Sequence, residues 1–356
     1  MVLIIAEAGV NHNGVEKLAF ELVDVASAAG ADVVKFQTFR ADKLVTASAA
    51  RAEYQVANTN TAETQHEMLA ALELSYDCFR RLALHCEATG IEFLSTAFDS
   101  ESLAFLTGDF GQKRLKIPSG ELSNAPFVLE HARAGLELIV STGMATLGEI
   151  EEALGIIAFG LVAETNARPS REAFAEAYAS AEARAAMREK VTVLHCTTEY
   201  PAPLHEINLS AMGSLERAFG LRCGYSDHSD GITVPIAATA MGATMIEKHF
   251  TLDRTMKGPD HRASLEPSQL GTMVQAIRDV QVALGDGVKR PMPSELKNKM
   301  IACKSLVAAR RINAGEVIGA DDISVMRPGG GTSPSRYWDV VGTTASRDYA
   351  EHETFD

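Results

Sequence analysis

Residues 2–38, VLIIAEAGVNHNGVEKLAFELVDVASAAGADVVKFQT, contain two short apolar runs separated by a segment with helical periodicity. The runs at 2–9 and 32–38 are rich in the β-branched residues that favour strands. Between them, the apolar residues of 17–29 recur at the spacing of an amphipathic helix. The stretch therefore predicts a strand, a helix and a second strand in succession.

The same alternation continues along the chain. Further apolar runs lie at 92–98, 114–121, 136–143, 191–197, 222–228 and 245–250, and helical patterns include 76–89, 147–159, 170–190 and 267–284. Eight strands alternating with helices predict an α/β fold, the closed (β/α)8 or TIM barrel. The alternative is an open doubly wound sheet, but no glycine-rich dinucleotide fingerprint follows the first strand.

The composition changes after Leu284. Residues 285–300, GDGVKRPMPSELKNKM, are typical of a linker, and residues 301–356 contain short β-like runs and turn signals. We therefore expect a barrel over 1–284, a linker over 285–300 and a small β-rich domain over 301–356. A domain of that size has little core of its own and is expected to pack against another surface.

Charge and cysteine content restrict the classes of partner. The 356 residues include 33 Lys and Arg against 47 Asp and Glu, a net charge of −14, which opposes binding to nucleic acid or anionic lipid. The longest apolar run, about 153–163, is too short to span a bilayer, and the N-terminus lacks the basic region of a secretory signal. Five widely spaced cysteines fit a reducing compartment, so we expect a cytoplasmic protein.

Polar residues gather where the predicted strands end. In a barrel these ends open on one face, whereas an inert barrel interior is filled by branched apolar side chains. The pattern predicts an active site there. Its members are Glu7, Lys35, Gln37, Thr96, Lys116, Ser119, Glu121, Ser141, His195, Thr197, Ser226, His228, Lys248 and His249.

Two lysines at strand ends, Lys35 and Lys116, have apolar neighbours, and a lysine is costly to bury without an anion. Either could instead extend to solvent or pair with a carboxylate such as Glu121. Together with hydroxyls from four other positions, they favour a phosphate or carboxylate site. Those hydroxyls belong to Thr96, Ser119, Ser141 and Ser226.

Two imidazoles, His228 and His249, end adjacent predicted strands and can bind a divalent cation while leaving positions for substrate. A role as general base or structural hydrogen-bonding residue is the alternative for each. Glu7, Glu121 and Asp260 supply carboxylates near the same mouth. They could orient hydroxyl groups, transfer protons or neutralise the lysines, and their spacing does not separate these roles.

Several strings, taken in order and spacing, resemble the sialic acid synthase family of bacterial nonulosonate synthases. They are AEAGVNHNG, VVKFQTF, KIPSGE, VSTGMAT, HCTTEYPAP, GYSDHS, IEKHFTLD, KGPDH and RPGGG. The resemblance covers nearly the whole chain, and residues 301–356 look like the family's antifreeze-like (SAF, β-clip) domain. It implies condensation of phosphoenolpyruvate with an N-acylated mannosamine-type sugar, giving a nine-carbon 2-keto acid and phosphate.

The resemblance also implies roles for individual residues. It places a divalent metal, Mn2+ with Mg2+ or Co2+ as alternatives, on His228 and His249, and makes Glu121, Glu7 and Lys116 catalytic, with Glu121 as the proton acceptor. It implies a domain-swapped homodimer in which Arg327 of the partner subunit contacts the N-acyl group. Phosphoenolpyruvate would be held by Lys35, Thr96, Lys116, Ser119, Ser141 and Ser226, and the sugar by Glu7, Gln37, Tyr200, Glu121 and Asp260.

Two departures from the family pattern matter. The string HCTTEYPAP carries Thr197 and Thr198 where some relatives have Asn, which leaves that strand's contact open and looks closer to the legionaminic acid branch than to the N-acetylneuraminate branch. The insertion at about 161–190 has no assignable role. Competing functions are a class II aldolase or another metal-dependent barrel lyase, and a non-catalytic carbohydrate-binding protein.

Overall fold

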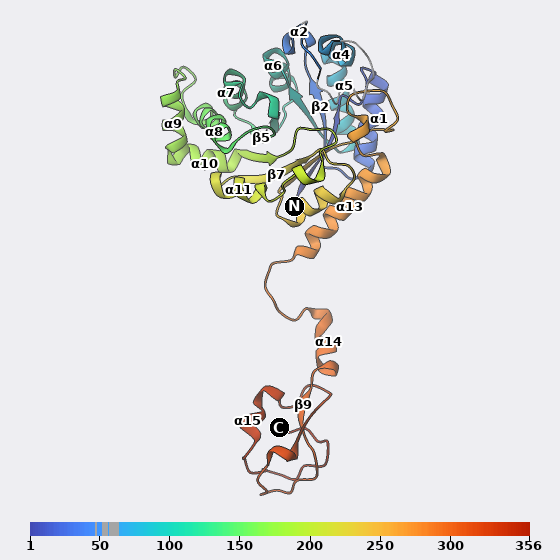
Figure 1. Ribbon diagram of the computed structural model, residues 1–356, viewed down its shortest axis with the longest axis vertical. Helices are drawn as coiled ribbons and strands as arrows, with labels where there is room; N and C mark the ends of the chain where they lie inside the picture. The colour runs from blue at the N-terminus through green and yellow to red at the C-terminus, as the bar shows by residue number, and fades with distance from the viewer. Residues whose placement is uncertain (47, 52–55, 57–63) are drawn as a thin grey trace. The chain divides into compact units, whose positions relative to one another are not determined.

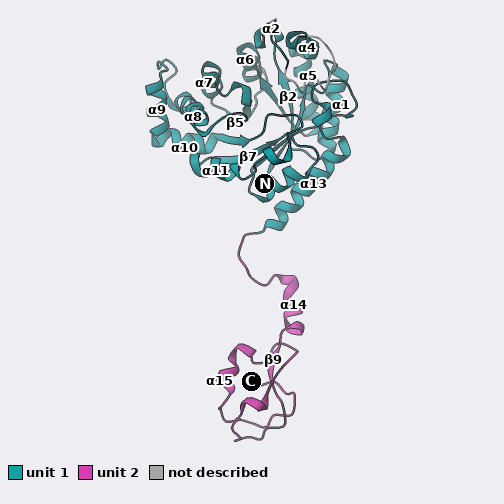
Figure 2. Ribbon diagram, viewed as in Figure 1, with its two compact units in different colours: residues 1–285 teal, residues 286–356 magenta. Residues whose placement is uncertain are grey.

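The computed structural model describes residues 1–46, 48–51, 56 and 64–356, and it divides into two compact units, 1–285 and 286–356 (Figures 1 and 2). Unit 1 contains eight parallel strands, each followed by at least one helix. The strands are β1 (Leu3–Gly9), β2 (Val33–Thr38), β3 (Glu92–Ala97), β4 (Arg114–Ile117), β5 (Glu137–Ser141), β6 (Val191–His195), β7 (Arg222–Asp227) and β8 (Met245–His249).

The strand order is β3-β2-β1-β8-β7-β6-β5-β4, so the first and last strands of the chain's barrel pair with each other. Its two end strands, β3 and β4, lie side by side. Among the described residues no backbone ladder joins these two, and this place is the seam of the barrel. The order and the seam contact confirm the predicted (β/α)8 barrel.

Helices cover the outside of the barrel (Figure 1). One of them, over Tyr76–Thr89, begins where a short polar side chain caps a free amide: Ser75 accepts a hydrogen bond from the amide of Cys78, and Gly90 ends the same helix with a positive φ of 76°. The helices are α1 (Glu16–Ala28), α2 (Ala41–Leu44), α4 (Gln65–Leu72), α5 (Tyr76–Thr89), α6 (Ser100–Asp109), α7 (Ala125–Arg133), α8 (Leu147–Val162), α9 (Arg171–Ala179), α10 (Ala181–Lys190), α11 (Ala211–Phe219), α12 (Thr233–Ala240) and α13 (Pro267–Leu284).

The helix predicted over 170–190 is in fact two helices. Ser180 lies between α9 and α10 in an extended conformation, and its side chain accepts a hydrogen bond from the amide of Ala183. A serine that caps the following turn competes with continuation of the helix through it. Both helices pack against α8, so the insertion thickens the outer layer of the barrel.

The barrel interior has two kinds of layer. A small apolar cluster fills the end at which the strands begin: Ile5, Val33, Leu94, Ile139, Leu194 and Met245. Two residues further along the same strands, side chains on the same face are polar, as at Glu7, Lys35 and Thr96. The apolar layer is therefore the floor on which the polar layer rests, and the larger core lies between strands and helices.

Unit 2 has a core of its own and only a two-stranded antiparallel sheet, β9 (Ser305–Ala308) with β10 (Ile323–Met326). Leu306, Ile312, Ile318 and Tyr349 are among the buried residues of that core. The segment expected to be a linker contains a helix, α14 (Pro293–Ala302), which begins at a proline compatible with a first helical turn. The short helix α15 (Tyr337–Val340) completes the unit.

In the described part of the chain, we find no helix that combines the length and apolar character needed to cross a membrane.

Candidate active site

A cavity of about 240 Å3 opens at the carboxyl ends of the barrel strands. It gathers most of the side chains predicted for the site, which come from the eight strands and the loops that follow them. Those lining it are Glu7, Lys35, Gln37, Thr96, Lys116, Ser119, Ser141, Tyr200, Ser226, His228, His249 and Asp260.

The centre of the site is a carboxylate that the sequence analysis did not name, Glu247 of β8. One of its oxygens lies 3.3 Å from Nζ of Lys116 and accepts a hydrogen bond of 3.0 Å from the hydroxyl of Ser226. The other lies 3.5 Å from Nζ of Lys35. Burial alone would raise the pKa of Glu247, but the two ammonium groups lower it to about 2. The residue is therefore a buried anion that links the two lysines.

The two lysines differ in their surroundings. Lys35 also lies 2.8 Å from Glu7 and donates a 3.2 Å hydrogen bond to Thr96. Burial by itself would lower the pKa of Lys35, yet the charges of Glu247 and Glu7 raise it above its ordinary value. Burial lowers the pKa of Lys116, which among the described residues has Glu247 as its one ion-pair partner. Of the two lysines, Lys116 is thus the one whose charge is less compensated.

Glu7 lies at the other end of this chain of charges. Gln37 donates a 3.3 Å hydrogen bond to one oxygen of the Glu7 carboxylate, and Lys35 contacts the other. Burial raises the pKa of Glu7, even though the charge of Lys35 opposes that effect. Gly9 has a φ of +53°, and a Cβ there would lie 3.4 Å from Gln37, Glu7 and His249, so the backbone turns tightly past these groups.

Hydroxyl groups line the wall beside Lys116. Ser119 accepts a 2.9 Å hydrogen bond from the amide of Gly143 and lies 3.2 Å from the thiol of Cys196. Among the described residues, the buried hydroxyls of Ser141 and Thr198 have no hydrogen-bond partner. Because buried polar groups are normally satisfied, these hydroxyls are available to a ligand that accepts hydrogen bonds.

The two histidines lie together, with ring centroids 5.6 Å apart, and Tyr200 contacts both rings. Nδ1 of His228 lies 2.6 Å from the carbonyl oxygen of Thr197, which can only accept, so that nitrogen carries the hydrogen and Nε2 keeps its lone pair. Nδ1 of His249 is buried with no partner. Burial lowers the pKa of both imidazoles, to about 4 for His228.

Neutral imidazoles with lone pairs aimed into a polar cavity are suitable ligands for a divalent transition metal. Among the described residues no cluster of three His, Cys, Asp or Glu side chains supplies a fuller ligand set. The arrangement therefore fits an ion held by two protein ligands with its other positions left to substrate and water, as in an open catalytic site.

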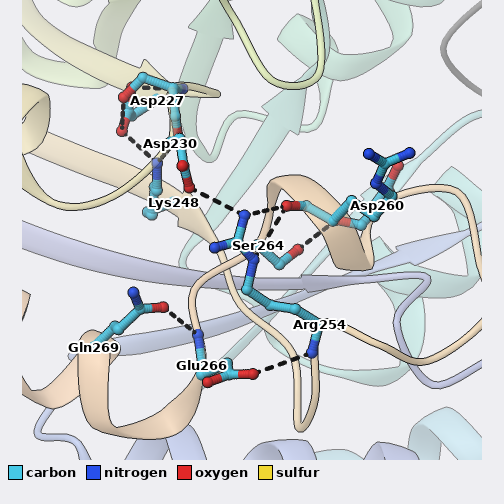
Figure 3. A network of polar contacts seen from close by, with 10 residues as sticks. Asp227, Asp230, Lys248, Arg254, Asp260, Ser264, Glu266 and Gln269 are labelled. Carbon is cyan, nitrogen blue, oxygen red and sulfur yellow. Dashed lines mark hydrogen bonds and ion pairs between the residues drawn. The ribbon is translucent and has the colours of Figure 1, made fainter. Parts of the chain in front are cut away.

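Asp260 faces the same cavity from the loop after β8, and burial, with a smaller effect of Glu7, raises its pKa to about 7. Its backbone oxygen accepts a 2.7 Å hydrogen bond from Ser264 (Figure 3). The hydroxyl of Ser264 in turn accepts a hydrogen bond of 2.9 Å from the side-chain amide of Asn11. The motifs at 6–14 and 257–261 are thus tied together.

Four predicted residues of unit 1 do not line the cavity: Glu121, His195, Thr197 and Lys248. The carboxylate of Glu121 accepts a 2.7 Å hydrogen bond from Asn124 and is not among the groups that line the cavity. Lys248 is fully buried away from it, and His195 bonds the carbonyl of Ile207 at 2.8 Å. Arg327 belongs to unit 2, where it is exposed and its Nε donates to Ala302.

One wall of the cavity is apolar, and the sequence analysis missed it. It is formed by Val10, by Met68, Leu69 and Leu72 of α4, and by Phe98. Glu247 could have been found from strand periodicity, since it lies two residues before His249 and so shares its face. The apolar wall could not, because three of its five members come from α4, a helix that a barrel does not require.

Of the two threonines that depart from the family pattern, Thr198 lines the cavity and Thr197 does not. The hydroxyl of Thr197 instead donates to the carbonyl of Glu206 at 3.3 Å. The contact left open by the sequence therefore belongs to Thr198.

Comparison with known proteins agrees with this site. The chain is 46% identical to the N,N'-diacetyllegionaminic acid synthase of Campylobacter jejuni, over 99% of this chain and 98% of that protein. It is 43% identical to the protein of the same name from Legionella pneumophila, over 99% of this chain and 92% of that protein. Among solved structures, the chain resembles the N-acetylneuraminic acid (sialic acid) synthetase of Leptospira borgpetersenii in complex with citrate. The two are 31% identical, and they superpose with a TM-score of 0.66 over 83% of this chain and 90% of that one.

Family models match both units. The SAF domain model matches residues 304–355, within unit 2, and the NeuB family model matches residues 22–289, which include all of the cavity except its first strand. These matches confirm the family resemblance of the sequence motifs. The chain belongs to the NeuB family.

Proposed function

We propose that this protein is a nonulosonic acid synthase that condenses phosphoenolpyruvate with 2,4-diacetamido-2,4,6-trideoxymannose, giving N,N'-diacetyllegionaminate and phosphate. The observation that carries the proposal is the meeting of two buried lysines at one carboxylate, beside two neutral imidazoles, in a single cavity. The names of the two relatives from Campylobacter jejuni and Legionella pneumophila support the same reaction and the same sugar.

The lysine side of the cavity suits phosphoenolpyruvate. Within the described part of the chain, Lys116 has one ion-pair partner, and the hydroxyls of Ser141 and Thr198 have no hydrogen-bond partner. An anion would therefore gain charge-assisted hydrogen bonds at this wall. Thr96, Ser119 and Ser226 supply further hydroxyls. Glu247 contacts both ammonium groups, and because its single charge is shared between them it leaves Lys116 partly uncompensated, whereas Lys35 also faces Glu7.

The imidazole side suits the sugar aldehyde. His228 and His249 would hold Mn2+, or Mg2+ or Co2+, and such an ion supplies Lewis acidity to a substrate carbonyl when bound. The residues of this chain fix the reactants: the lysines hold the enol so that its C3 faces the aldehyde carbon. C3 forms the new bond, water adds at C2, and the C–O bond breaks so that phosphate leaves with the bridging oxygen.

Proton transfer has to be assigned to groups within the cavity. The new alkoxide needs a proton and the attacking water loses one. Asp260, with a pKa near 7, can hold and release a proton at neutral pH. Glu7, whose pKa is raised by burial, is the second carboxyl group of the cavity. We give these two the acid and base roles, in place of Glu121, which bonds Asn124.

The apolar wall supports the choice of sugar. A 6-deoxy sugar has a methyl group where N-acetylmannosamine has a hydroxymethyl group, and Met68, Leu72 and Phe98 offer no hydrogen bond to a hydroxyl. A hydrophobic surface rejects an added hydroxyl only modestly, by about a hundredfold at most. N-acetylmannosamine should therefore be a slower substrate, and so should a 6-phosphorylated sugar.

We also propose a domain-swapped homodimer in which Arg327 of one chain serves the cavity of the other. Supporting this, Arg327 is exposed on a unit that has only a small core, and its Nε bonds the end of α14. Such an arginine could donate to the oxygen of an N-acyl group.

The deciding experiment measures phosphate release and product mass after mixing the protein, Mn2+ and phosphoenolpyruvate with each of the three sugars. We expect the highest kcat/KM for the diacetamido trideoxy sugar. A tenfold preference for N-acetylmannosamine would overturn the assignment of the sugar. Absence of phosphate release with every sugar would overturn the synthase itself, and aldol cleavage without phosphoenolpyruvate would indicate a lyase.

A further inference from the structure

The residue next to each imidazole takes part in a fully buried ion pair. Lys248, which precedes His249, lies 2.6 Å from the carboxylate of Asp227, which precedes His228, and both side chains have no exposed area (Figure 3). Side chains alternate along a strand, so this pair lies behind the sheet while the imidazoles face the cavity. Neither Asp227 nor Lys248 is among the residues that line the cavity.

Stability alone gives no strong reason for such a pair. Taking two charges out of water costs about as much as their attraction returns, and apolar residues of similar size often serve equally well. An ion pair does, however, fix the relative positions of its two partners, because the charges are compensated only when the ammonium and carboxylate groups meet. Here it fixes the backbone next to the two imidazoles.

The ladder between β7 and β8 ends at the pair. Asp227 and Lys248 are the last partners in register, so His228 lies beyond the backbone hydrogen bonds that join the two strands. Lys248 extends the connection, because Nζ also donates a 2.5 Å hydrogen bond to the carbonyl of Ser229. Asp227 in turn accepts hydrogen bonds of 3.0 Å from both the amide and the hydroxyl of Ser229.

The ammonium group thus holds the residue before His228 and the residue after it. Both contacts start from the residue adjacent to His249. On the cavity side, the carbonyl of Thr197 fixes the His228 ring at Nδ1, but among the described residues no hydrogen bond fixes the His249 ring at its Nδ1. The separation of the imidazoles therefore depends on the backbone behind them.

We propose that Lys248 and Asp227 form a clamp that positions His228 and His249 at the separation needed to share one divalent cation. Neither residue is a metal ligand or a catalytic residue; both act through the imidazoles. The inference rests on the proposed metal site of the synthase, and it adds positioning residues whose removal weakens metal binding without removing any ligand.

The test compares Mn2+ affinity with folding. The double variant Asp227→Asn/Lys248→Met removes both charges together and so avoids leaving one buried charge unpaired. Calorimetry on the metal-free protein should show Mn2+ bound about 10- to 100-fold more weakly than by the unaltered chain. The melting temperature in the absence of metal should stay within a few degrees.

A matched control removes an ion pair at the opposite end of the strands. Arg278 and Asp32 lie 2.7 Å apart at the start of β2, and Asp32 also accepts a hydrogen bond from the amide of Ile4. The variant Asp32→Asn/Arg278→Met should lose stability but keep its Mn2+ affinity. A conservative variant, Lys248→Arg, keeps the charge and should recover part of the affinity lost in the double variant.

The outcomes separate the clamp from the proposed function. A folded double variant with the Mn2+ affinity of the unaltered chain would overturn the clamp and leave the metal site standing. If the double variant does not fold, Asp227→Asn alone decides, because it removes the carboxylate charge that Lys248 faces while keeping the shape of the side chain, and an unchanged Mn2+ affinity in that variant would equally overturn the clamp. Failure of the unaltered protein to bind Mn2+, Mg2+ or Co2+ would overturn the metal site and the clamp with it.

Discussion

Replacing Glu247 by glutamine should destabilise the free protein and, at the same time, strengthen its binding of a simple anion. The substitution keeps the shape of the side chain and removes its charge. Lys35 would retain Glu7 at 2.8 Å, but Lys116 would lose its one ion-pair partner among the described residues. The perturbation therefore creates an uncompensated cation that is 4% exposed.

The size of the effect follows from the structure in two ways. Removing one partner of a buried ion pair costs about 3–5 kcal/mol. The pKa of Glu247, about 2 against an ordinary 4.5, corresponds to roughly 3 kcal/mol of preference for the ionised form in the folded protein. We therefore expect a loss of about 3 kcal/mol in the free energy of unfolding, or roughly 6–12 °C in the melting temperature of a domain of this size.

The assay is denaturation of protein free of metal and substrate at pH 7, followed by calorimetric titration with inorganic phosphate. Removing a negative charge so close to both lysines should tighten phosphate binding by about tenfold or more. The control is Glu137→Gln, a partly exposed carboxylate 3.5 Å from Arg114, where the loss should be under about 1 kcal/mol. Wild-type stability together with wild-type phosphate affinity in Glu247→Gln would refute the central role given to this carboxylate.

Four further outcomes are expected. Phosphoenolpyruvate labelled with 18O at the bridging position should yield labelled phosphate; label kept in the keto acid would contradict C–O cleavage. Because the folded-state pKa of Asp260 is raised to about 7 from 3.8, its contribution to stability is full below about pH 4 and lost as the pH rises through 7. The free energy of unfolding of Asp260→Asn should therefore equal that of the unaltered chain at pH 4 and exceed it at pH 8 by up to about 4 kcal/mol. The same difference between the two proteins at both pH values would count against the raised pKa. Met68→Gln should lower the kcat/KM ratio of the trideoxy sugar to N-acetylmannosamine by about tenfold, and an unchanged ratio would remove the apolar wall from the specificity argument. Mixing inactive His249→Ala and Arg327→Ala chains should restore part of the activity, and a strictly monomeric active protein would rule out the swapped dimer.

The sequence predicted the barrel well because strand and helix periodicities repeat eight times and agree with each other. It failed where a single side chain decides the outcome. Ser180 breaks a segment that is alanine-rich on both sides, and α14 forms in a stretch whose prolines are typical of a linker. Proline at a first helical turn starts a helix as readily as it ends one, and composition does not distinguish these cases.

The site was predicted as a set of residue types more accurately than as a set of contacts. Lys248 was placed at the mouth because it stands beside His249, but adjacent residues of a strand point to opposite faces, and Glu247 faces the cavity instead. Glu121 ends the motif KIPSGE, where the chain has already turned into a short 3-10 helix, so strand alternation no longer orients it. Burial and pairing, which set the pKa of Glu247 and Asp260, depend on packing that periodicity does not describe.

The seam between β3 and β4 makes the circumference of the barrel adjustable at one place. Everywhere else, widening the mouth would stretch a row of backbone hydrogen bonds, whereas here the two edges meet without one. Phe98 follows the first edge and Pro118 the second, and both line the cavity. Enzyme engineers seeking to admit bulkier acceptor aldehydes should therefore randomise these two positions first, since widening the barrel there leaves the hydrogen bonds between its other strands intact.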